Sequence, residues 1–141
     1  MVNIKIDHNE ISVPEGTTIM EAAALAGIDI PKLCYLKDIN EIAACRVCLV
    51  EVVGKEKLVT SCNNKVQEGL EILTNSPRVR VARKQNVQLI LSQHDFKCAT
   101  CVRSGNCQLQ KLSNDLNIHY QPYAVQPERS NVDLSVPIVR E

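Results

Sequence analysis

Seven cysteines and one histidine fall into two groups whose spacing is typical of metal or cluster ligands. The first group has the spacing C-x10-C-x2-C-x13-C and consists of Cys34, Cys45, Cys48 and Cys62. Thiolates are soft, anionic ligands, and four of them suit a 2Fe-2S cluster. The C-x2-C pair can reach a cluster from one loop, whereas the two outer cysteines must be brought in by the fold. We therefore expect a 2Fe-2S site whose formation is coupled to folding, with backbone N–H groups of residues 43–48 bonded to its sulfurs.

The second group has the spacing H-x3-C-x2-C-x5-C and consists of His94, Cys98, Cys101 and Cys107. One imidazole and three thiolates suit a cubane 4Fe-4S cluster and carry one negative charge fewer than four thiolates. By the electrostatic logic of other histidine-ligated clusters, such a site should be reduced more easily. The eight residues of the two groups are the candidate cofactor and metal ligands, and we predict no catalytic residue.

Two other interpretations remain open at this point. Three cysteines and one histidine also form a known structural zinc set, so a zinc-stabilised interaction module is an alternative, above all at the second group. Cys45 and Cys48 could instead be a redox-active thiol pair, although no thioredoxin-like helix follows them. The N-terminus, MVNIKIDHNE, lacks the basic and apolar regions of a signal peptide. We therefore expect a cytoplasmic protein, in which clustered cysteines favour metal over disulfides.

The chain has 141 residues, a length that suits one ordinary domain or two small ones. Apolar residues make up 45% of the chain, but it has one Phe, three Tyr and no Trp, so the core must be aliphatic. The net charge is zero, which gives no argument for binding nucleic acid, and no apolar run is long enough to span a membrane. The four basic residues between positions 78 and 84 are expected to form a solvated helix face.

Hydrophobic periodicity predicts the elements that must position the two groups. Strands are expected at residues 2–6 and 11–13 around a turn, then at 47–53, 58–60 and 70–74. Thr18 and Glu21 form a capping box that should start a helix ending at Gly27. Ser76 and Pro77 should start a second helix, whose apolar side also carries His94. Leu109, Leu112 and Leu116 mark a short third helix, and the Pro-rich segment 121–141 is expected to be an extended docking tail.

With both ligand groups in view, the chain resembles a known family. It is similar to the N-terminal region shared by the large cluster-bearing subunit of respiratory complex I, FeFe hydrogenases and NAD-linked formate dehydrogenases. The stretch CVRSGNCQLQ (101–110) looks closest to the hydrogenase branch. The resemblance implies an α+β fold: a 2Fe-2S ferredoxin-like β-grasp domain at 1–76, followed by a small helical 4Fe-4S domain at 77–120. It also implies the same eight ligands.

The chain differs from the full-length family pattern after PIVRE (137–141), because no C-x2-C-x2-C-x3-C run follows. It has only five glycines, and none forms the G-x-G-x-x-G fingerprint of nucleotide sites. We therefore expect an electron-transfer subunit, or the N-terminal part of a longer hydrogenase or dehydrogenase. The partners that the resemblance implies are a flavoprotein subunit that handles NAD(P)H and a catalytic oxidoreductase subunit, in a hetero-oligomeric complex.

Overall fold

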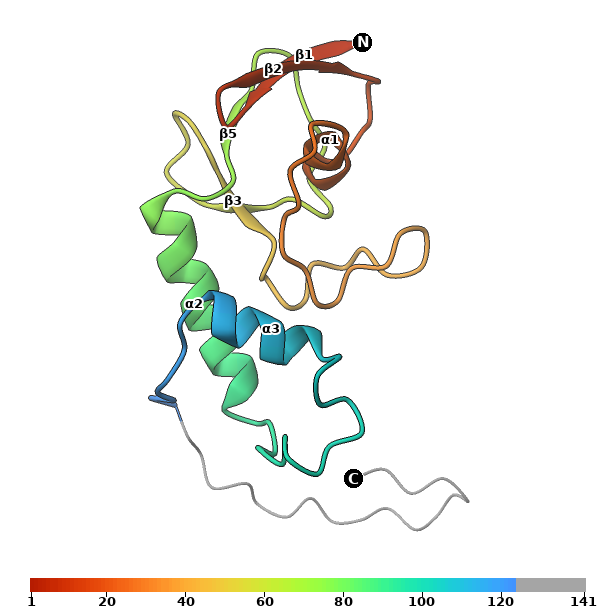
Figure 1. Cartoon of the computed structure of the whole chain (residues 1–141). Helices are drawn as coiled ribbons and strands as arrows, with labels where there is room; N and C mark the ends of the chain where they lie inside the picture. The colour runs from red at the N-terminus through yellow and green to blue at the C-terminus, as the bar shows by residue number, and fades with distance from the viewer. Residues whose placement is uncertain (124–141) are drawn as a thin grey trace.

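The computed structural model describes residues 1–123, which form a sheet with one helix against it and a helical extension below (Figure 1). The five strands of the sheet are β1 (Val2–Ile6), β2 (Asn9–Val13), β3 (Leu49–Val52), β4 (Val59–Thr60) and β5 (Glu71–Leu73). Their order is β2-β1-β5-β3-β4, with β1 and β5 parallel and the other neighbours antiparallel. This mixed sheet holding one helix confirms the predicted α+β class and β-grasp architecture.

The first hairpin is tighter than the sequence pattern predicts. Ile6 pairs with Asn9, so the turn consists of Asp7 and His8 alone, and β2 starts two residues earlier than expected. Both turn residues have positive φ, 45° and 73°, which is the backbone that a two-residue turn needs to match the twist of its strands. The Asp7 carboxylate also accepts a hydrogen bond from the backbone N–H of Thr74 at 2.7 Å. This contact ties the turn to the segment after β5.

Helix α1 (Ile19–Leu25) covers the sheet and completes the main core. The capping box is present: the N–H of Glu21 donates to Thr18 Oγ1 at 3.2 Å, and the N–H of Thr18 donates to Glu21 Oε2 at 3.1 Å. Gly27, with φ of 75°, follows the helix end as predicted. The core is aliphatic throughout, and its fully buried members include Ile6 and Ile72. Cys48 and Cys62 belong to the same core, so two of the thiols are held by the packing of the sheet and α1.

Loss of the Thr18 cap should loosen α1 by a measurable amount. Replacing an N-cap threonine with alanine typically costs about 1 kcal/mol. If α1 opens locally, Thr18→Ala should therefore increase amide hydrogen exchange in α1 by about fivefold. Thr18→Ser keeps the capping oxygen and should exchange like the wild type. Equal exchange in the alanine and serine variants would show that the cap does not control the opening of this helix.

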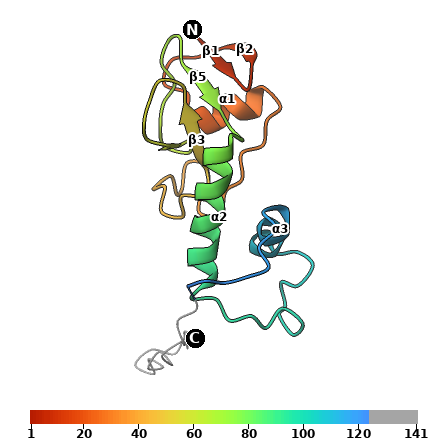
Figure 2. The same cartoon turned by 90° about the vertical axis from the view of Figure 1, so that its left-hand side faces the viewer.

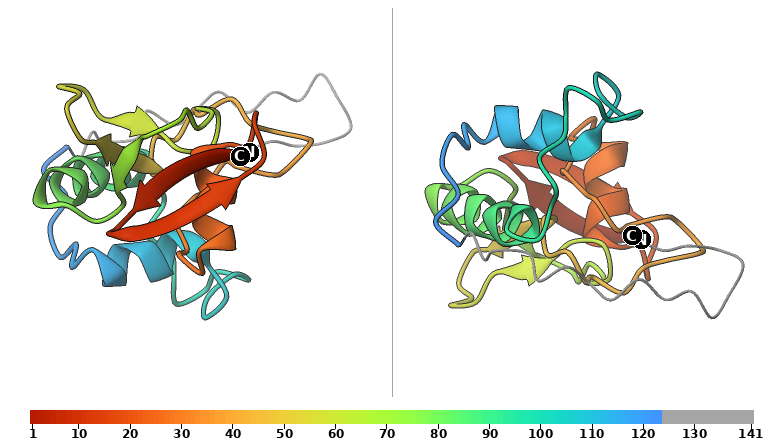
Figure 3. Two further views of the ribbon diagram at one scale, coloured as in Figure 1. Left: turned by 90° about the horizontal axis from the view of Figure 1, so that it is seen from above. Right: turned by 90° about the horizontal axis from the view of Figure 1, so that it is seen from below.

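Two further helices extend from the sheet. Helix α2 (Pro77–Leu91) begins after β5, with Ser76 as N-cap: its Oγ accepts the N–H of Val79 at 3.3 Å. Helix α3 (Gln108–Asp115) follows the loop that carries the second group of cysteines. Figure 2 shows α2 reaching from the sheet down to the level of α3, and in Figure 3 α2 (green) and α3 (blue) lie on two different sides of the strands. No helix within residues 1–123 has the length and apolar character that a membrane span requires.

The two helices share a second hydrophobic core, which we call the inter-site core. Its buried members are Val47, Val87, Leu91 and Leu112. Val47 belongs to the C-x2-C loop of the first group, so this core joins the helical part to the first cysteine loop instead of standing apart from it. Of the proposed tail at 121–141, only residues 121–123 lie within the described part, and the prediction for 124–141 falls outside it.

Candidate functional site

The first group of cysteines converges from three separate segments. Cys34 lies on the segment after α1, Cys45 and Cys48 lie on the loop before β3, and Cys62 lies two residues after β4. Cys48 and Cys62 are almost fully buried, with 1% and 0% of their surface exposed, whereas Cys34 and Cys45 are half-buried. The N–H of Ser61 donates to the carbonyl of Cys48 at 3.0 Å, which holds the two buried cysteine segments together. The fold thus brings the segments of Cys48 and Cys62 together and places the N–H of Cys45 against the sulfur of Cys34.

Backbone N–H groups of the loop face the thiols, as the sequence predicted. The N–H of Cys45 donates to the sulfur of Cys34 at 3.5 Å. Ala43 and Arg46 have positive φ, 55° and 50°. Residues with positive φ redirect the N–H groups of a loop, and loops in which several N–H groups turn to one side bind anions. Such a loop stabilises thiolates and the negative charge of a bound cluster.

The ionisation of the thiols shows that the four sulfurs lie within electrostatic range of one another. Burial raises the pKa of Cys62 to about 12, and the Cys48 thiol and then the charges of Cys34 and Cys45 act in the same direction. Burial also raises the pKa of Cys34, although the N–H of Cys45, which donates to its sulfur, acts in the opposite direction. At Cys45 burial is outweighed by the N–H groups of Val47 and Cys34, which hold its pKa below the usual range. A positive group bound between the sulfurs would relieve this mutual repulsion, so the donor set fits an iron-sulfur cluster.

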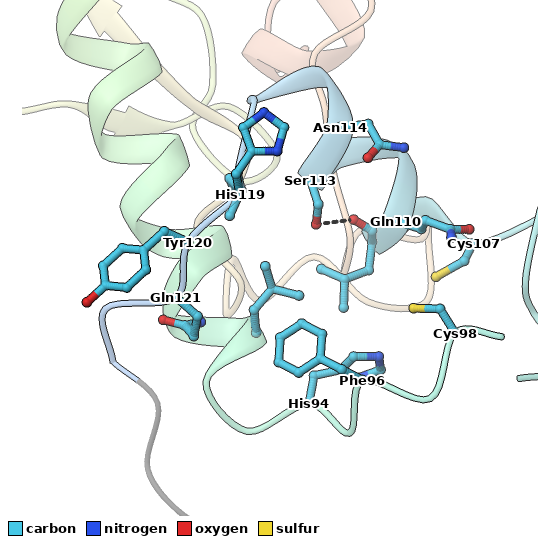
Figure 4. Close-up of a pocket in the computed structure, with 13 residues that line it drawn as sticks. His94, Phe96, Cys98, Cys107, Gln110, Ser113, Asn114, His119, Tyr120 and Gln121 are labelled. Atoms are coloured by element: carbon cyan, nitrogen blue, oxygen red, sulfur yellow. Dashed lines mark hydrogen bonds between the residues drawn. The ribbon is translucent and has the colours of Figure 1, made fainter. Parts of the chain in front are cut away.

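A pocket of about 300 Å³ lies at the lower end of α2, beside three members of the second group (Figure 4). His94, Cys98 and Cys107 line it together with apolar residues from α2 and α3. The sulfurs of Cys98 and Cys107 point toward each other in Figure 4. The ring of His94 packs edge-on against Phe96, with 5.9 Å between the ring centroids. The pocket thus offers cysteine and histidine side chains beside both apolar residues and the polar Gln110, Ser113 and Asn114, and its cysteines and histidine have the donor chemistry of a histidine-ligated cluster.

The structure does not bring every predicted member of the second group to this pocket. Cys101 does not line it; its side chain is exposed, and its sulfur accepts the N–H of Arg103 at 3.4 Å. His119, which no spacing motif singled out, lies on the pocket wall beside the residues that follow α3. It comes close only through the packing of the chain after α3, so the sequence held no signal for it. All seven cysteines are free thiols. Within residues 1–123, no three His, Cys, Asp or Glu side chains are grouped closely enough to hold a single metal ion.

The two groups are joined by the inter-site core. Cys45 of the first group packs against it as a partly buried member. Leu91 and Leu109, which belong to or pack against the same core, line the pocket of the second group. The two candidate sites therefore contact one continuous set of packed aliphatic side chains.

Two family profiles match this chain and together cover most of it. One is described as a 2Fe-2S iron-sulfur cluster binding domain and matches residues 1–77. The other is described as an NADH-ubiquinone oxidoreductase-G iron-sulfur binding region and matches residues 83–122. The expectation of one 2Fe-2S and one 4Fe-4S cluster is confirmed by these matches, which favour iron-sulfur chemistry over zinc in both halves of the chain.

Similar proteins of named function agree with the family profiles. The chain is 42% identical to the NADP-reducing hydrogenase subunit HndD of Solidesulfovibrio fructosivorans, matching over its whole length and 25% of that protein. It is 37% identical to the NADPH-Fe(3+) oxidoreductase subunit alpha of Geobacter sulfurreducens, over 99% of this chain and 16% of the relative. It is 39% identical to the NADH-ubiquinone oxidoreductase 75 kDa subunit of Reclinomonas americana, over 80% of this chain and 16% of the relative. The chain thus spans a quarter or less of these relatives.

A solved structure also shares the fold. A chain of an NAD+-reducing [NiFe]-hydrogenase in the H2-reduced state superimposes with a TM-score of 0.79 at 29% identity, over 96% of this chain and 57% of the other. Together with the named relatives, it confirms the resemblance to cluster-bearing subunits of hydrogenases and NADH dehydrogenases.

Proposed function

Because this chain belongs to the family of 2Fe-2S iron-sulfur cluster binding domains, we propose that it is the electron-transfer module of a larger oxidoreductase. Bound iron-sulfur clusters accept and donate single electrons, and the protein's part is to bind, space and tune them. The chain would relay electrons between a partner that handles NAD(P)H and a catalytic subunit of the hydrogenase, formate dehydrogenase or NADH dehydrogenase type. It carries out no chemistry of its own in this proposal.

The proposed ligands are the two groups read from the sequence. Cys34, Cys45, Cys48 and Cys62 would hold the 2Fe-2S cluster, supported by the converging thiols and the N–H groups that face them. His94, Cys98, Cys101 and Cys107 would hold the 4Fe-4S cluster, supported by the pocket that three of them line. Cys101 would turn inward when the cluster is bound. We assign residues 1–76 to the first cluster domain, 77–120 to the second, and 121–141 to a docking tail.

The observation that carries the relay is the inter-site core. An electron relay needs its two centres close together and joined by packed protein rather than by open water. Cys45 packs on this core from one side, and Leu91 and Leu109 extend from it into the pocket of His94.

The partners are proposed from the relatives and from the surface. The relatives are named as subunits of an NADP-reducing hydrogenase and an NADPH-Fe(3+) oxidoreductase, which supports a hetero-oligomeric complex with an NAD(P)H-handling flavoprotein. The loop between Cys34 and Cys45 exposes three large aliphatic side chains, Leu36, Ile39 and Ile42. Exposed apolar groups gathered on one loop are typical of interaction sites. We propose that this loop contacts the partner that exchanges electrons with the first cluster. The same role fits a separate subunit and the N-terminal part of a longer enzyme.

Electron paramagnetic resonance (EPR) of fully reduced protein tests the relay. Two reduced clusters that are close enough to exchange electrons alter each other's line shape and spin relaxation. The spectrum of the wild type should therefore differ from the sum of the spectra of Cys48→Ala and Cys98→Ala, each of which lacks one cluster. A wild-type spectrum equal to that sum, with unchanged microwave power saturation, would show that the two clusters do not interact and would contradict the relay.

A further inference from the structure

Arg83 lies on the buried face of α2, four residues after the buried Val79 and four before the buried Val87. The basic residues of α2 were expected to be solvated, yet Arg83 is only 5% exposed. Its Nε donates to the carbonyl of Val47 at 2.9 Å, and its Nη2 donates to the carbonyls of Leu49 at 2.9 Å and Thr74 at 3.2 Å. The guanidinium group thus donates to the carbonyls of the two residues that flank Cys48 in the chain.

Other donors complete the same pattern along the loop. Asn86, one turn further along α2, donates its Nδ2 to the carbonyl of Arg46 at 2.7 Å. The carbonyl of Cys48 accepts the hydroxyl of Ser61 at 2.9 Å and its N–H at 3.0 Å. The four consecutive carbonyls of residues 46–49 therefore all have fixed donors, and α2 supplies the donors for three of them.

Fixed carbonyls also fix the N–H groups that face the thiols. In a trans peptide the C=O and the following N–H point in opposite directions. The peptide whose carbonyl is held by Asn86 carries the N–H of Val47, and this N–H lowers the pKa of the Cys45 thiol. The α2 side chains thus act on the ligand loop from the face opposite the sulfurs.

The charge of Arg83 has no carboxylate counterpart in the described part of the chain. The ion pairs found within residues 1–123 do not include it. Burial lowers its pKa, and the one charge that opposes this effect is that of Cys48. A buried cation held by neutral carbonyls alone is costly, because carbonyl dipoles replace only part of its hydration. Negative charge at the neighbouring thiolate site would compensate it.

We propose that Arg83 is a positioning residue for the first cluster, which fixes the C-x2-C loop and places a buried positive charge that raises the reduction potential of the cluster. Reduction adds one negative charge, and a nearby cation in a region of low dielectric constant stabilises the reduced form. The proposal rests on the assignment of Cys45 and Cys48 as cluster ligands. It also gives α2 a double role, because the chain that leaves its C-terminal end carries His94.

The test compares Arg83→Gln with Arg80→Gln in the full chain, purified anaerobically. Arg80 lies one turn earlier on α2 and is exposed, so both variants remove one positive charge from the same helix. An EPR redox titration should give a more negative midpoint potential for the first cluster in Arg83→Gln than in Arg80→Gln or the wild type. Asn86→Ala, which changes no charge, should release the first cluster to a chelator faster than the wild type. A potential and a release rate in Arg83→Gln equal to those in Arg80→Gln would overturn the proposal.

A second pair of variants decides the case in which Arg83→Gln does not fold. Arg83→Lys keeps the charge but lacks the planar fork that joins the carbonyls of Val47 and Leu49. It should hold a first cluster with a potential near that of Arg80→Lys but release it faster to a chelator; equal release rates would overturn the positioning role. The 2Fe-2S signal of the wild type distinguishes a failure of this proposal from a failure of the ligand assignment. A wild type without a 2Fe-2S signal would refute the assignment, whereas a normal wild type with unaffected Arg83 variants would refute only the role of Arg83.

Discussion

Cys48→Ala is expected to abolish the 2Fe-2S signal and leave the 4Fe-4S signal in place. Cys48 is buried immediately before β3, next to the equally buried Cys62, so no exposed thiol can move in to replace it. A 2Fe-2S cluster with three protein thiolates has lost one of its four bonds to the chain, and the remaining site also loses part of its folding energy. Iron analysis should fall by about two atoms per chain. EPR after dithionite reduction should show only the second centre.

The matched control is Cys98→Ala, which removes a proposed ligand of the second group. Cys98 is exposed, so this change should not disturb the core of the sheet. It should remove the 4Fe-4S signal and leave the 2Fe-2S signal, the reverse of Cys48→Ala. A full 2Fe-2S signal in Cys48→Ala would show that this cysteine is not a ligand.

His94→Ala is expected to remove the 4Fe-4S cluster, and His94→Cys to restore it at a more negative potential. Alanine leaves one iron without a protein ligand, whereas cysteine supplies a thiolate. The thiolate adds one negative charge relative to neutral imidazole, and added negative charge disfavours reduction. Acid-labile sulfide analysis should show the loss and the recovery, and an EPR redox titration should show the shift in potential.

His119 provides the control for this prediction within the same pocket. Both histidines line the pocket, but His119 follows α3 and belongs to no ligand spacing. His119→Ala should keep the second cluster with its full iron and sulfide content. If His119→Ala lost the cluster while His94→Ala kept it, the histidine ligand would be His119 and the H-x3-C pattern would have been misinterpreted.

Local signals account for the elements that sequence analysis predicted correctly. Alternation of apolar residues over 2–6, the Thr18 capping box and the Ser76-Pro77 helix start each depend on neighbours within four residues. The ligand spacings are also local patterns, apart from the long intervals to Cys34 and Cys62. Strand ends were less accurate, as at β2, because a two-residue turn with positive φ at Asp7 and His8 has no glycine to reveal it.

The features that sequence analysis missed depend on tertiary packing. Unlike the exposed Arg80, Arg83 shares its helical spacing with the buried Val79 and Val87, but its charge favoured a solvated position. The carbonyls of the C-x2-C loop that accept from its guanidinium group reach it only through tertiary packing. The inter-site core joins Val47 to Leu112, which are far apart in the chain, so no window of the sequence contains both. His119 reaches the second pocket for the same reason. The sequence predicted two consecutive domains, and the packing of Val47 against α2 and α3 is a tertiary contact that no local pattern reveals.

The most direct test of the account is the iron and acid-labile sulfide content of anaerobically purified protein, combined with EPR after dithionite reduction. The account predicts about six irons and six sulfides per chain, with two distinguishable reduced signals, one from each cluster. About two irons and two sulfides would leave only the first site and contradict the assignment of His94, Cys98, Cys101 and Cys107. Zinc without sulfide would contradict the electron-transfer proposal and leave a metal-stabilised structural module.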